Sequence, residues 1–286
     1  MQKEINKILK FINNNFDENE KAIIAVSGGL DSDVITRLTY KVLRKEQIKL
    51  FIVIQSNMEM SHLQNARELA KELKLTLIEI SLQDIPYQIV SSVQEADNSE
   101  GFNKNGLLDT SRTKVALRTV VNSIYQDKGY KVIGTSNKTE IELGFFLPFG
   151  DGIAHLKPIA HLYKSDVFKI AKELGTNKKV LEQPPSAGLW IGEKDLEDIS
   201  YWIYNETPIQ KEINFSENDI QKVEKIYAEL SIKKLDLALS LLSDKRKLMD
   251  IALLTSFNLS TVKKLKKLVK NSKNFKLKPI NRMIYD

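Results

Sequence analysis

A short glycine-containing segment near the N-terminus has the composition of a phosphate-binding loop. It consists of Ser27, Gly28, Gly29, Leu30, Asp31 and Ser32. Glycines let a backbone approach a phosphate closely, and serine hydroxyls and the N–H groups that begin a helix donate to phosphate oxygens. Asp31 would repel a bare phosphate, so the segment predicts a Mg²⁺ ion between this carboxylate and a polyphosphate such as that of ATP.

The sequence around this segment argues against a plain helix start with incidental glycines. The apolar run 22–26 precedes it and is typical of a buried strand, and residues 32–46 follow with apolar positions at helical spacing. No lysine follows the glycines, which excludes a Walker-type loop. A strand, a glycine loop and a helix in this order favour a pyrophosphate site at the end of a strand.

Strand-like and helical stretches alternate along the first two thirds of the chain. The strand-like runs are 22–26, 50–54, 75–80 and 131–133, and the helical stretches are 4–16, 32–46, 61–73 and 111–127. This alternation predicts an α/β fold with a doubly wound parallel sheet. Because ligands bind beyond the carboxyl ends of such strands, residues 27–32 and 134–137 are expected to line one crevice.

Two other regions complete the predicted organisation. Residues 82–110 contain the polar, glycine-containing segment 97–106, which indicates a long loop that could act as a lid. From residue 206 the pattern is purely helical. We therefore predict an α/β domain over 1–205 and a helical C-terminal extension with a basic tail over 206–286.

The composition excludes several classes of site and protein. The chain has no cysteine, so disulfides, thiolate metal sites, a cysteine nucleophile and a built-in cysteine glutaminase are excluded. Its three histidines are scattered, which argues against a histidine metal cluster. No apolar run reaches the length of a membrane span, and the N-terminus does not resemble a signal peptide. We expect no membrane association and a cytoplasmic location.

The net charge of +6 is concentrated in the lysines of residues 263–278. These lysines could form an anion-binding or RNA-binding face, as in a tRNA-modifying enzyme, or the solvated side of an amphipathic helix. Val262, Leu265, Leu268 and Val269 supply the apolar side of such a helix. We favour the solvated helix for most of the lysines, and nucleic-acid binding is not expected.

A second dense series of motifs lies between residues 134 and 190. It comprises Gly134-Thr135-Ser136-Asn137-Lys138-Thr139-Glu140, Gly144-Phe145-Phe146, Gly150-Asp151-Gly152, Leu162-Tyr163-Lys164 and Pro184-Pro185-Ser186-Ala187-Gly188-Leu189-Trp190. With the glycine loop, the series resembles the N-type ATP pyrophosphatases, whose fold is Rossmann-like. Within that class it resembles the ammonia-dependent NAD synthetases, over roughly residues 20–205.

The resemblance implies a two-step ligase reaction. A carboxylate attacks the α-phosphate of ATP, giving an acyl-adenylate and pyrophosphate, and ammonia then displaces AMP to form an amide. By resemblance, Asp31 and Glu140 bind Mg²⁺, and Thr135, Lys164 and Ser186 contact ATP together with the loop 27–32. We add Asp151 as a residue that could take a proton from ammonia. The family resemblance also implies a homodimer, and a separate glutaminase could supply the ammonia.

The chain departs from the family pattern where the carboxylate substrate, deamido-NAD, is recognised. Ala116 replaces an arginine, Leu147-Pro148 replaces Thr-Lys, His155 replaces an aspartate, and Phe275-Lys276-Leu277-Lys278 lacks a histidine. Deamido-NAD remains the best single substrate, with Arg112, Lys114 or Lys157 as replacement contacts. The alternative is the same chemistry on another carboxylate, such as a uronic-acid sugar or a different nucleotide conjugate.

Overall fold

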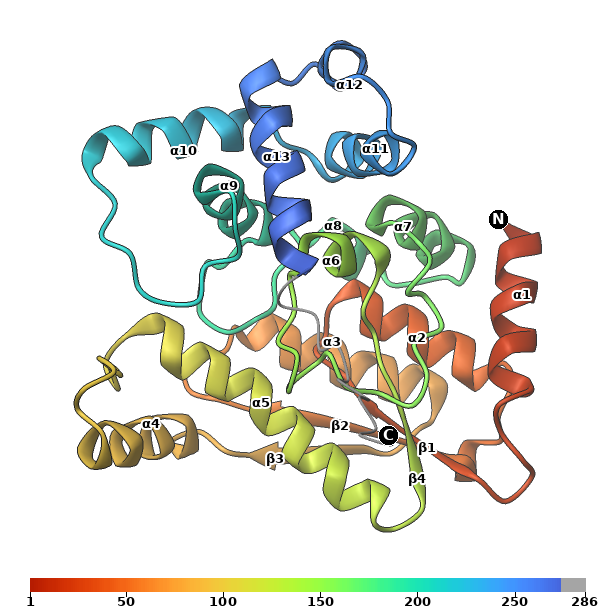
Figure 1. Ribbon diagram of the computed structural model, residues 1–286. Helices are drawn as coiled ribbons and strands as arrows, with labels where there is room; N and C mark the ends of the chain where they lie inside the picture. Colours follow the sequence, from red (N-terminus) through yellow and green to blue (C-terminus); the bar gives the residue numbers. More distant parts are fainter. Residues whose placement is uncertain (274–286) are drawn as a thin grey trace, which may run out of the picture.

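The computed structural model describes residues 1–273, and its centre is a parallel sheet of four strands in the order β3-β2-β1-β4 (Figure 1). The strands are β1 (Lys21–Ala25), β2 (Ile48–Ile54), β3 (Leu77–Ser81) and β4 (Tyr130–Ile133). Successive strands run outward from β1 to β3, and the chain then returns to place β4 on the other side of β1. This reversal makes the β1–β4 gap the topological switch point, and it confirms the predicted α/β class.

Helices cover both faces of the sheet (Figure 1). Those of the α/β region are α1 (Gln2–Asn13), α2 (Leu30–Tyr40), α3 (Met60–Leu73), α4 (Ile85–Ala96), α5 (Leu107–Gln126), α6 (Lys138–Leu143), α7 (Lys164–Glu173) and α8 (Lys178–Glu182), with a 3₁₀ turn at Lys45–Gln47. One apolar core joins the sheet to α1, α2, α3 and α7, and a second joins its other face to α5. Both Ile23 and Ile24 of β1 are fully buried, Ile24 in the first core and Ile23 in the second. Because both faces of this strand are covered, its sequence is a continuous apolar run.

The prediction of one long loop over 82–110 was wrong, because helix α4 lies inside it. Pro86 stands in the first turn of α4, where its fixed φ suits a helix and its missing N–H leaves no bond unmade. Pro86 and Val90 are the buried residues of this helix, so a weak apolar face was enough to form it. The irregular parts of this stretch are therefore residues 82–84 and 97–106.

The C-terminal helices pack around a third apolar core above the sheet (Figure 1). They are α9 (Asp195–Asn205), α10 (Glu217–Glu229), α11 (Ile232–Ser243), α12 (Leu248–Thr255) and α13 (Leu259–Ser272). Leu143 of α6 and Ile199 of α9 belong to the same core as α10–α13. The boundary near residue 205 stays a prediction, since this core contains residues from both sides of it.

Helix α13 has the amphipathic character that its sequence predicts. Val262, Leu265 and Leu268 are fully buried, whereas Lys264 Nζ donates to the carbonyl of Tyr204 and Lys267 pairs with Glu206. Part of the basic run thus fastens α13 to the end of α9, as expected for the polar side of a packed helix. No helix within residues 1–273 is long and apolar enough to cross a membrane.

Candidate active site

The glycine loop connects β1 to α2 and is closed by its own serine hydroxyls. Ser32 Oγ donates to the carbonyl of Gly29 at 3.0 Å and accepts from the N–H of Ser27 at 3.2 Å. Gly28 has φ 76°, and a Cβ at this position would lie 2.0 Å from the backbone oxygen of His62. Glycine is therefore required at residue 28 both for its dihedral angle and for the close approach of α3.

Side chains of α3 hold the loop from behind. His62 Nδ1 lies 3.1 Å from the carbonyl oxygen of Ser27, and Asn65 Nδ2 donates to that of Gly28 at 3.2 Å. Gln183 completes the network, because its amide lies 2.9 Å from His62 Nε2 and accepts from Asn65 at 2.7 Å. Burial lowers the pKa of His62, so the neutral ring donates through Nδ1 and accepts from Gln183. The loop is thereby linked to the chain that leads into the Pro184-Pro185-Ser186 segment.

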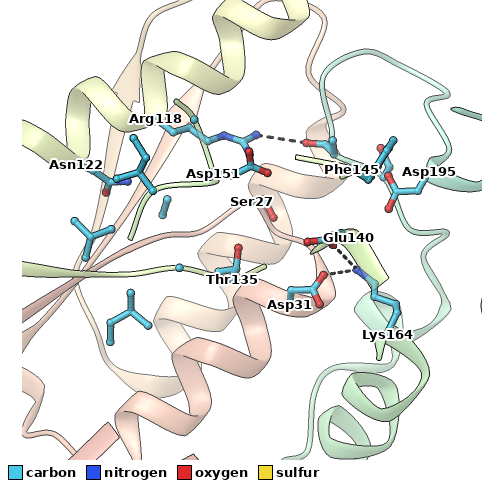
Figure 2. A pocket seen from close by; sticks show the side chains of 18 residues that line it. Ser27, Asp31, Arg118, Asn122, Thr135, Glu140, Phe145, Asp151, Lys164 and Asp195 are labelled. Atoms are coloured by element: carbon cyan, nitrogen blue, oxygen red, sulfur yellow. Dashed lines mark hydrogen bonds and ion pairs between the residues drawn. The ribbon is translucent and has the colours of Figure 1, made fainter. Parts of the chain in front are cut away.

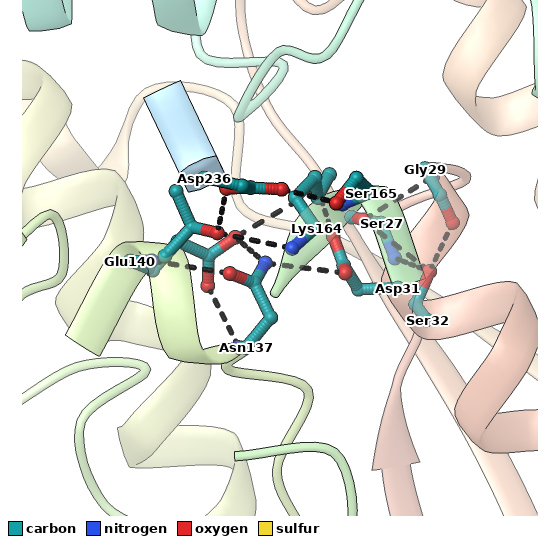
Figure 3. Close-up of polar contacts among 10 residues, drawn as sticks. Ser27, Gly29, Asp31, Ser32, Asn137, Glu140, Lys164, Ser165 and Asp236 are labelled. Carbon is teal, nitrogen blue, oxygen red and sulfur yellow. Dashed lines mark hydrogen bonds and ion pairs between the residues drawn. The ribbon is translucent and has the colours of Figure 1, made fainter. Parts of the chain in front are cut away.

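Three charged side chains meet beside the loop, each from the first turn of a different helix (Figure 3). Lys164 Nζ forms an ion pair with Asp31 Oδ2 and lies 3.8 Å from Glu140 Oε1. Asn137 Nδ2 donates to Glu140 Oε1 at 2.6 Å and to Asp31 Oδ1 at 3.3 Å. The predicted residues Asp31, Glu140 and Lys164 are thus brought together. Asn137, from the segment 134–137 that was expected to line the crevice, bridges the two carboxylates.

The charges of this cluster suit a bound metal–phosphate group. Burial and the neighbouring Asp31 raise the pKa of Glu140 well above its ordinary value. Burial alone would lower the pKa of Lys164, but Asp31 and Glu140 together raise it. Within residues 1–273 no group of three or more His, Cys, Asp or Glu side chains could hold a metal by itself. Two carboxylates completed by substrate phosphates are, however, a common donor set for Mg²⁺, and Asp31 with Glu140 fits it.

A crevice at the carboxyl ends of β1 and β4 contains most of the predicted site (Figure 2). Its lining includes Ser27, Asp31, Thr135, Glu140, Asp151, Lys164 and Ser186. Gly29 and Leu30 line an adjoining smaller pocket together with His62 and Gln183. Figure 2 shows Arg118, Asn122 and Asp151 at the other end from Asp31 and Lys164. We call the group Ser27, Asp31, Glu140 and Lys164 the phosphate end, and the group Arg118, Asn122 and Asp151 the arginine end.

Ser186 lines the crevice but its hydroxyl is already engaged. It donates to Glu193 Oε2 at 3.0 Å, and the same carboxylate oxygen accepts from the N–H of Leu189 at 2.8 Å. Burial raises the pKa of Glu193 to about 6. Glu193 therefore shapes the segment that carries Ser186, a role that the sequence did not reveal.

Asp151 occupies the arginine end and is likewise partly engaged. Its Oδ1 accepts from the N–H of Leu147 at 2.8 Å, and burial raises its pKa against the opposing charges of Arg118 and Lys157. Asp195, at the start of α9, also lines the crevice, and burial raises its pKa to about 6. Its Oδ1 is buried without a hydrogen-bond partner within residues 1–273. No spacing signal in the sequence pointed to Asp195, which arrives from a distant helix.

Two of the residues that depart from the family pattern, His155 and Leu147, form hydrogen bonds with the backbone. His155 is exposed and its Nδ1 accepts from the N–H of Val132 at 3.0 Å. The carbonyl of Leu147 accepts from the N–H groups of Gly150 and Gly152, each at 2.9 Å, which closes the turn around Asp151. Ala116 and His155 are absent from the crevice lining, while Phe275-Lys276-Leu277-Lys278 lies outside the described residues.

The three cations suggested as replacement contacts donate to backbone carbonyls. Lys114 Nζ donates to Ser56 and Leu189, Arg112 to Ile209 and Lys157 to Gly152. Arg118 is the cation that lines the crevice at its arginine end, with a longer contact of 3.4 Å to the carbonyl of Ala187. An anion at that end would therefore meet Arg118 first.

A family model, curated relatives and solved structures were compared with this chain, and all of them are described as NAD or NMN synthases or synthetases. Residues 4–233 match the family model described as NAD synthase. The NH3-dependent NAD+ synthetase of Thermoplasma acidophilum is 31% identical over 196 residues, which cover 68% of this chain and 78% of that protein. An NMN synthetase structure from Francisella tularensis has a TM-score of 0.72 at 24% identity, covering 98% of both chains. An NH3-dependent NAD synthetase structure from Campylobacter jejuni, in complex with the nitrate ion, has a TM-score of 0.67 at 20% identity, covering 98% of this chain and 97% of that one.

The two structures share the fold along almost the whole chain, including the C-terminal helices. The family model spans the glycine loop and the motifs between residues 134 and 190. The chain belongs to the NAD synthase family.

Proposed function

We propose that this chain is an ATP-dependent ligase that amidates deamido-NAD with ammonia, giving NAD, AMP and pyrophosphate. The observation that carries the proposal is the meeting of Asp31, Glu140 and Lys164 beside the loop 27–32 in a chain of the NAD synthase family. The NH3-dependent NAD+ synthetases among its relatives support ammonia as the nitrogen source. The absence of cysteine also agrees with a chain that lacks a cysteine glutaminase.

The phosphate end is proposed to bind the pyrophosphate portion of ATP. Loop N–H groups and the hydroxyls of Ser27 and Ser32 donate to phosphate oxygens, and Thr135 and Ser186 contact the nucleotide. Lys164 exchanges part of its ion pair with Asp31 for the phosphates, and offsets the negative charge that grows on pyrophosphate as the α–β bond breaks. The substrate carboxylate is already an anion, so its attack on the α-phosphorus needs no general base.

Asp31 and Glu140 are proposed to hold Mg²⁺ together with those phosphates. When bound there, the ion would neutralise phosphate charge. This chain's own residues prepare the position: Asn137 orients both carboxylates, and Lys164 limits their mutual repulsion before the nucleotide arrives.

Ammonia attacks the acyl carbon, AMP leaves, and the nitrogen must lose a proton. We propose Asp151 for that proton, because it lines the crevice and its raised pKa makes it a better acceptor than an ordinary carboxylate. Asp195 is the matched comparison, since it also lines the crevice with a raised pKa. Asp151→Asn should lower the rate of ammonia transfer more than Asp195→Asn does; the reverse order would exclude Asp151 as the acceptor.

The support for deamido-NAD as the acid comes from membership of the NAD synthase family. The residues of the arginine end do not identify the acid by themselves. The comparisons do not support a uronic-acid sugar or another unrelated carboxylate. Because an NMN synthetase from Francisella tularensis shares the fold, nicotinate mononucleotide is the informative competitor for an assay. It carries the same reacting carboxylate without the adenylate half.

We also propose that two chains associate as a homodimer through α5. Val120 and Ile124 lie one helical turn apart on this helix and are 53% and 58% exposed. Light scattering should show a dimer, and Ile124→Asp should yield monomers; a monomeric wild-type protein would exclude the proposal. A separate glutaminase and a cytoplasmic location stay predictions, as does the lack of nucleic-acid binding.

The direct test is an assay of purified protein with ATP, Mg²⁺ and ammonium. With deamido-NAD we expect equal amounts of NAD and AMP, and no AMP without an acid. A preference for nicotinate mononucleotide would correct the substrate and keep the chemistry. No product from either acid, with AMP released for an unrelated carboxylate, would reject the proposal.

A further inference from the structure

A buried carboxylate of the helical extension reaches both helices that carry the phosphate end. Asp236 of α11 is only 4% exposed. Its Oδ1 accepts from Thr139 Oγ1 at 2.6 Å, and its Oδ2 accepts from the N–H of Ser165 at 2.7 Å (Figure 3). One side chain thus joins the first turn of α6 to the first turn of α7.

These two turns hold the charged residues of the site. Thr139 precedes Glu140 in the chain, and Ser165 follows Lys164. Thr139 Oγ1 also accepts from the N–H of Lys164 at 3.0 Å, so Asp236, Thr139 and the start of α7 form a closed ring of hydrogen bonds. A shift of Asp236 would therefore be transmitted to both Glu140 and Lys164.

The electrostatic setting indicates that this carboxylate is held by its hydrogen bonds. Burial raises the pKa of Asp236, while the bonds from Thr139 and Ser165 act in the opposite direction. The first turns of two helices face it, and the positive ends of helix dipoles favour an anion. Each of its two bonds is charge-assisted and stronger than a neutral one.

We propose that Asp236 is a positioning residue for ATP. It fixes α6 against α7, so that Glu140 and Lys164 face Asp31 at the spacing that a metal-bound pyrophosphate group needs. The inference rests on the proposed ATP site. Asp236 lies just outside residues 4–233, the part of the chain that matches the family model, so the extension supplies a support that this match does not include.

A packing role is the competing explanation, and it makes a different prediction. Leu235 and Leu239 of the same helix are buried in the core of the helical layer. If Asp236 only fastened α11, its loss would lower the melting temperature without changing the affinity for ATP. Leu239→Ala tests that case, because it loosens the same helix and leaves the ring of hydrogen bonds intact.

The experiment measures ATP binding by calorimetry, with Mg²⁺ and no acid substrate, alongside the melting temperature. Asp236→Asn and Thr139→Val should weaken ATP binding about tenfold, the effect of one charge-assisted hydrogen bond. Thr139→Ser keeps the hydroxyl and should bind ATP like the wild type. Leu239→Ala and the exposed Asp244→Asn at the end of the same helix should also bind normally, although Leu239→Ala melts earlier. The double variant should weaken ATP binding by less than the product of the two single effects, since both variants disrupt the bond between Asp236 and Thr139.

Wild-type ATP affinity in both Asp236→Asn and Thr139→Val would overturn the inference, and so would an equal loss in Leu239→Ala. If Asp236→Asn fails to fold, the pair Thr139→Val and Thr139→Ser decides alone. The readout is independent of the acid. A wild-type protein that binds ATP but makes no NAD would therefore reject the proposed substrate, while the comparison of variants still tests Asp236.

Discussion

The two ends of the crevice are built in different ways. At the phosphate end, Ser27 and Asp31 come from one contiguous loop, and Glu140 and Lys164 come from the first turns of two short helices that are hydrogen-bonded to each other. At the arginine end, Arg118 approaches from α5 and Asp151 from an irregular turn closed by backbone bonds. The phosphate end holds its charged side chains at fixed positions. At the arginine end the turn is held by backbone bonds, which depend less on the identity of the neighbouring side chains. The departures that fall within residues 1–273, at Ala116, Leu147-Pro148 and His155, all lie outside the phosphate end.

The largest effect is expected from the phosphate end. Asp31→Asn removes a negative charge that pairs with Lys164, and with it half of the proposed Mg²⁺ donor set. We expect the rate of pyrophosphate release to fall by about 1000-fold, the scale of losing a main electrostatic contact in an active site.

Asp166→Asn is the matched control for Asp31→Asn. Asp166 also lies in a first helical turn, but it pairs with Lys169 at the surface. Its replacement should leave the rate unchanged. Pyrophosphate release within about tenfold of wild type in Asp31→Asn would contradict the assigned role of this carboxylate.

The loop itself should tolerate no side chain at residue 28. Gly28→Ala combines a left-handed backbone angle with an overlap against His62, and together these should cost about 2–5 kcal/mol of folding free energy. Gly175→Ala provides the control, because Gly175 has φ 75° with open space around it and should lose only about 1–2 kcal/mol. Equal destabilisation in chemical denaturation would show that the contact with α3 is unimportant.

Replacing a residue that departs from the family pattern should have only a small effect on catalysis. His155→Asp restores the residue usual in the family, but His155 is exposed and bonded to the N–H of Val132. We expect kcat/KM for deamido-NAD to change less than about threefold, since the loss of one exposed hydrogen bond is worth about 0.5–1.5 kcal/mol and falls on stability. A rise of more than tenfold would mean that position 155 contacts the acid, and that the arginine end extends further than the crevice indicates.

A further prediction concerns how the stability of the protein depends on pH. Burial raises the pKa of Asp198, in the first turn of α9, to about 7, with Glu193 and Asp195 adding to the rise. A raised carboxyl pKa favours the protonated folded state, so this contribution to stability is present at acid pH and is lost as the pH rises to about 7. Asp198→Asn should therefore stabilise the protein by roughly 1 kcal/mol at pH 8 and have little effect near pH 4. Thermal melts across this range that show a pH-independent difference would refute the raised pKa.

The sequence predicted which residues meet at the phosphate end, because each of them belongs to a short contiguous motif, and their roles stay predictions. The loop 27–32 is contiguous, and the alternation of strands and helices predicted that residues 134–137 lie beside it. The hydrogen bonds that hold these motifs in place were not predicted, because they join residues that are far apart in the chain. Gln183 meets His62 from 121 residues away, and Asp236 meets Thr139 from 97 residues away. Such pairs follow no periodicity, and a buried polar contact has no signature until the helices are packed.

Helix α4 was missed for a local reason. The polar segment 97–106 decided the interpretation of the whole stretch, although Ile85, Ile89, Val90 and Val93 already have helical spacing. Of the arginine end, the sequence analysis named Asp151 and did not name Arg118 or Asn122. The cations that it suggested instead, Arg112, Lys114 and Lys157, donate to backbone carbonyls.

The proposed reaction depends most on adenylation at the phosphate end, which can be measured without ammonia. Wild-type protein with ATP, Mg²⁺, deamido-NAD and labelled pyrophosphate should return label to ATP, because the acyl-adenylate forms reversibly before nitrogen is added. The exchange should require the acid and disappear in Asp31→Asn. Exchange that proceeds without an acid, or NAD formation by a protein that never exchanges label under these conditions, would contradict the proposed reaction.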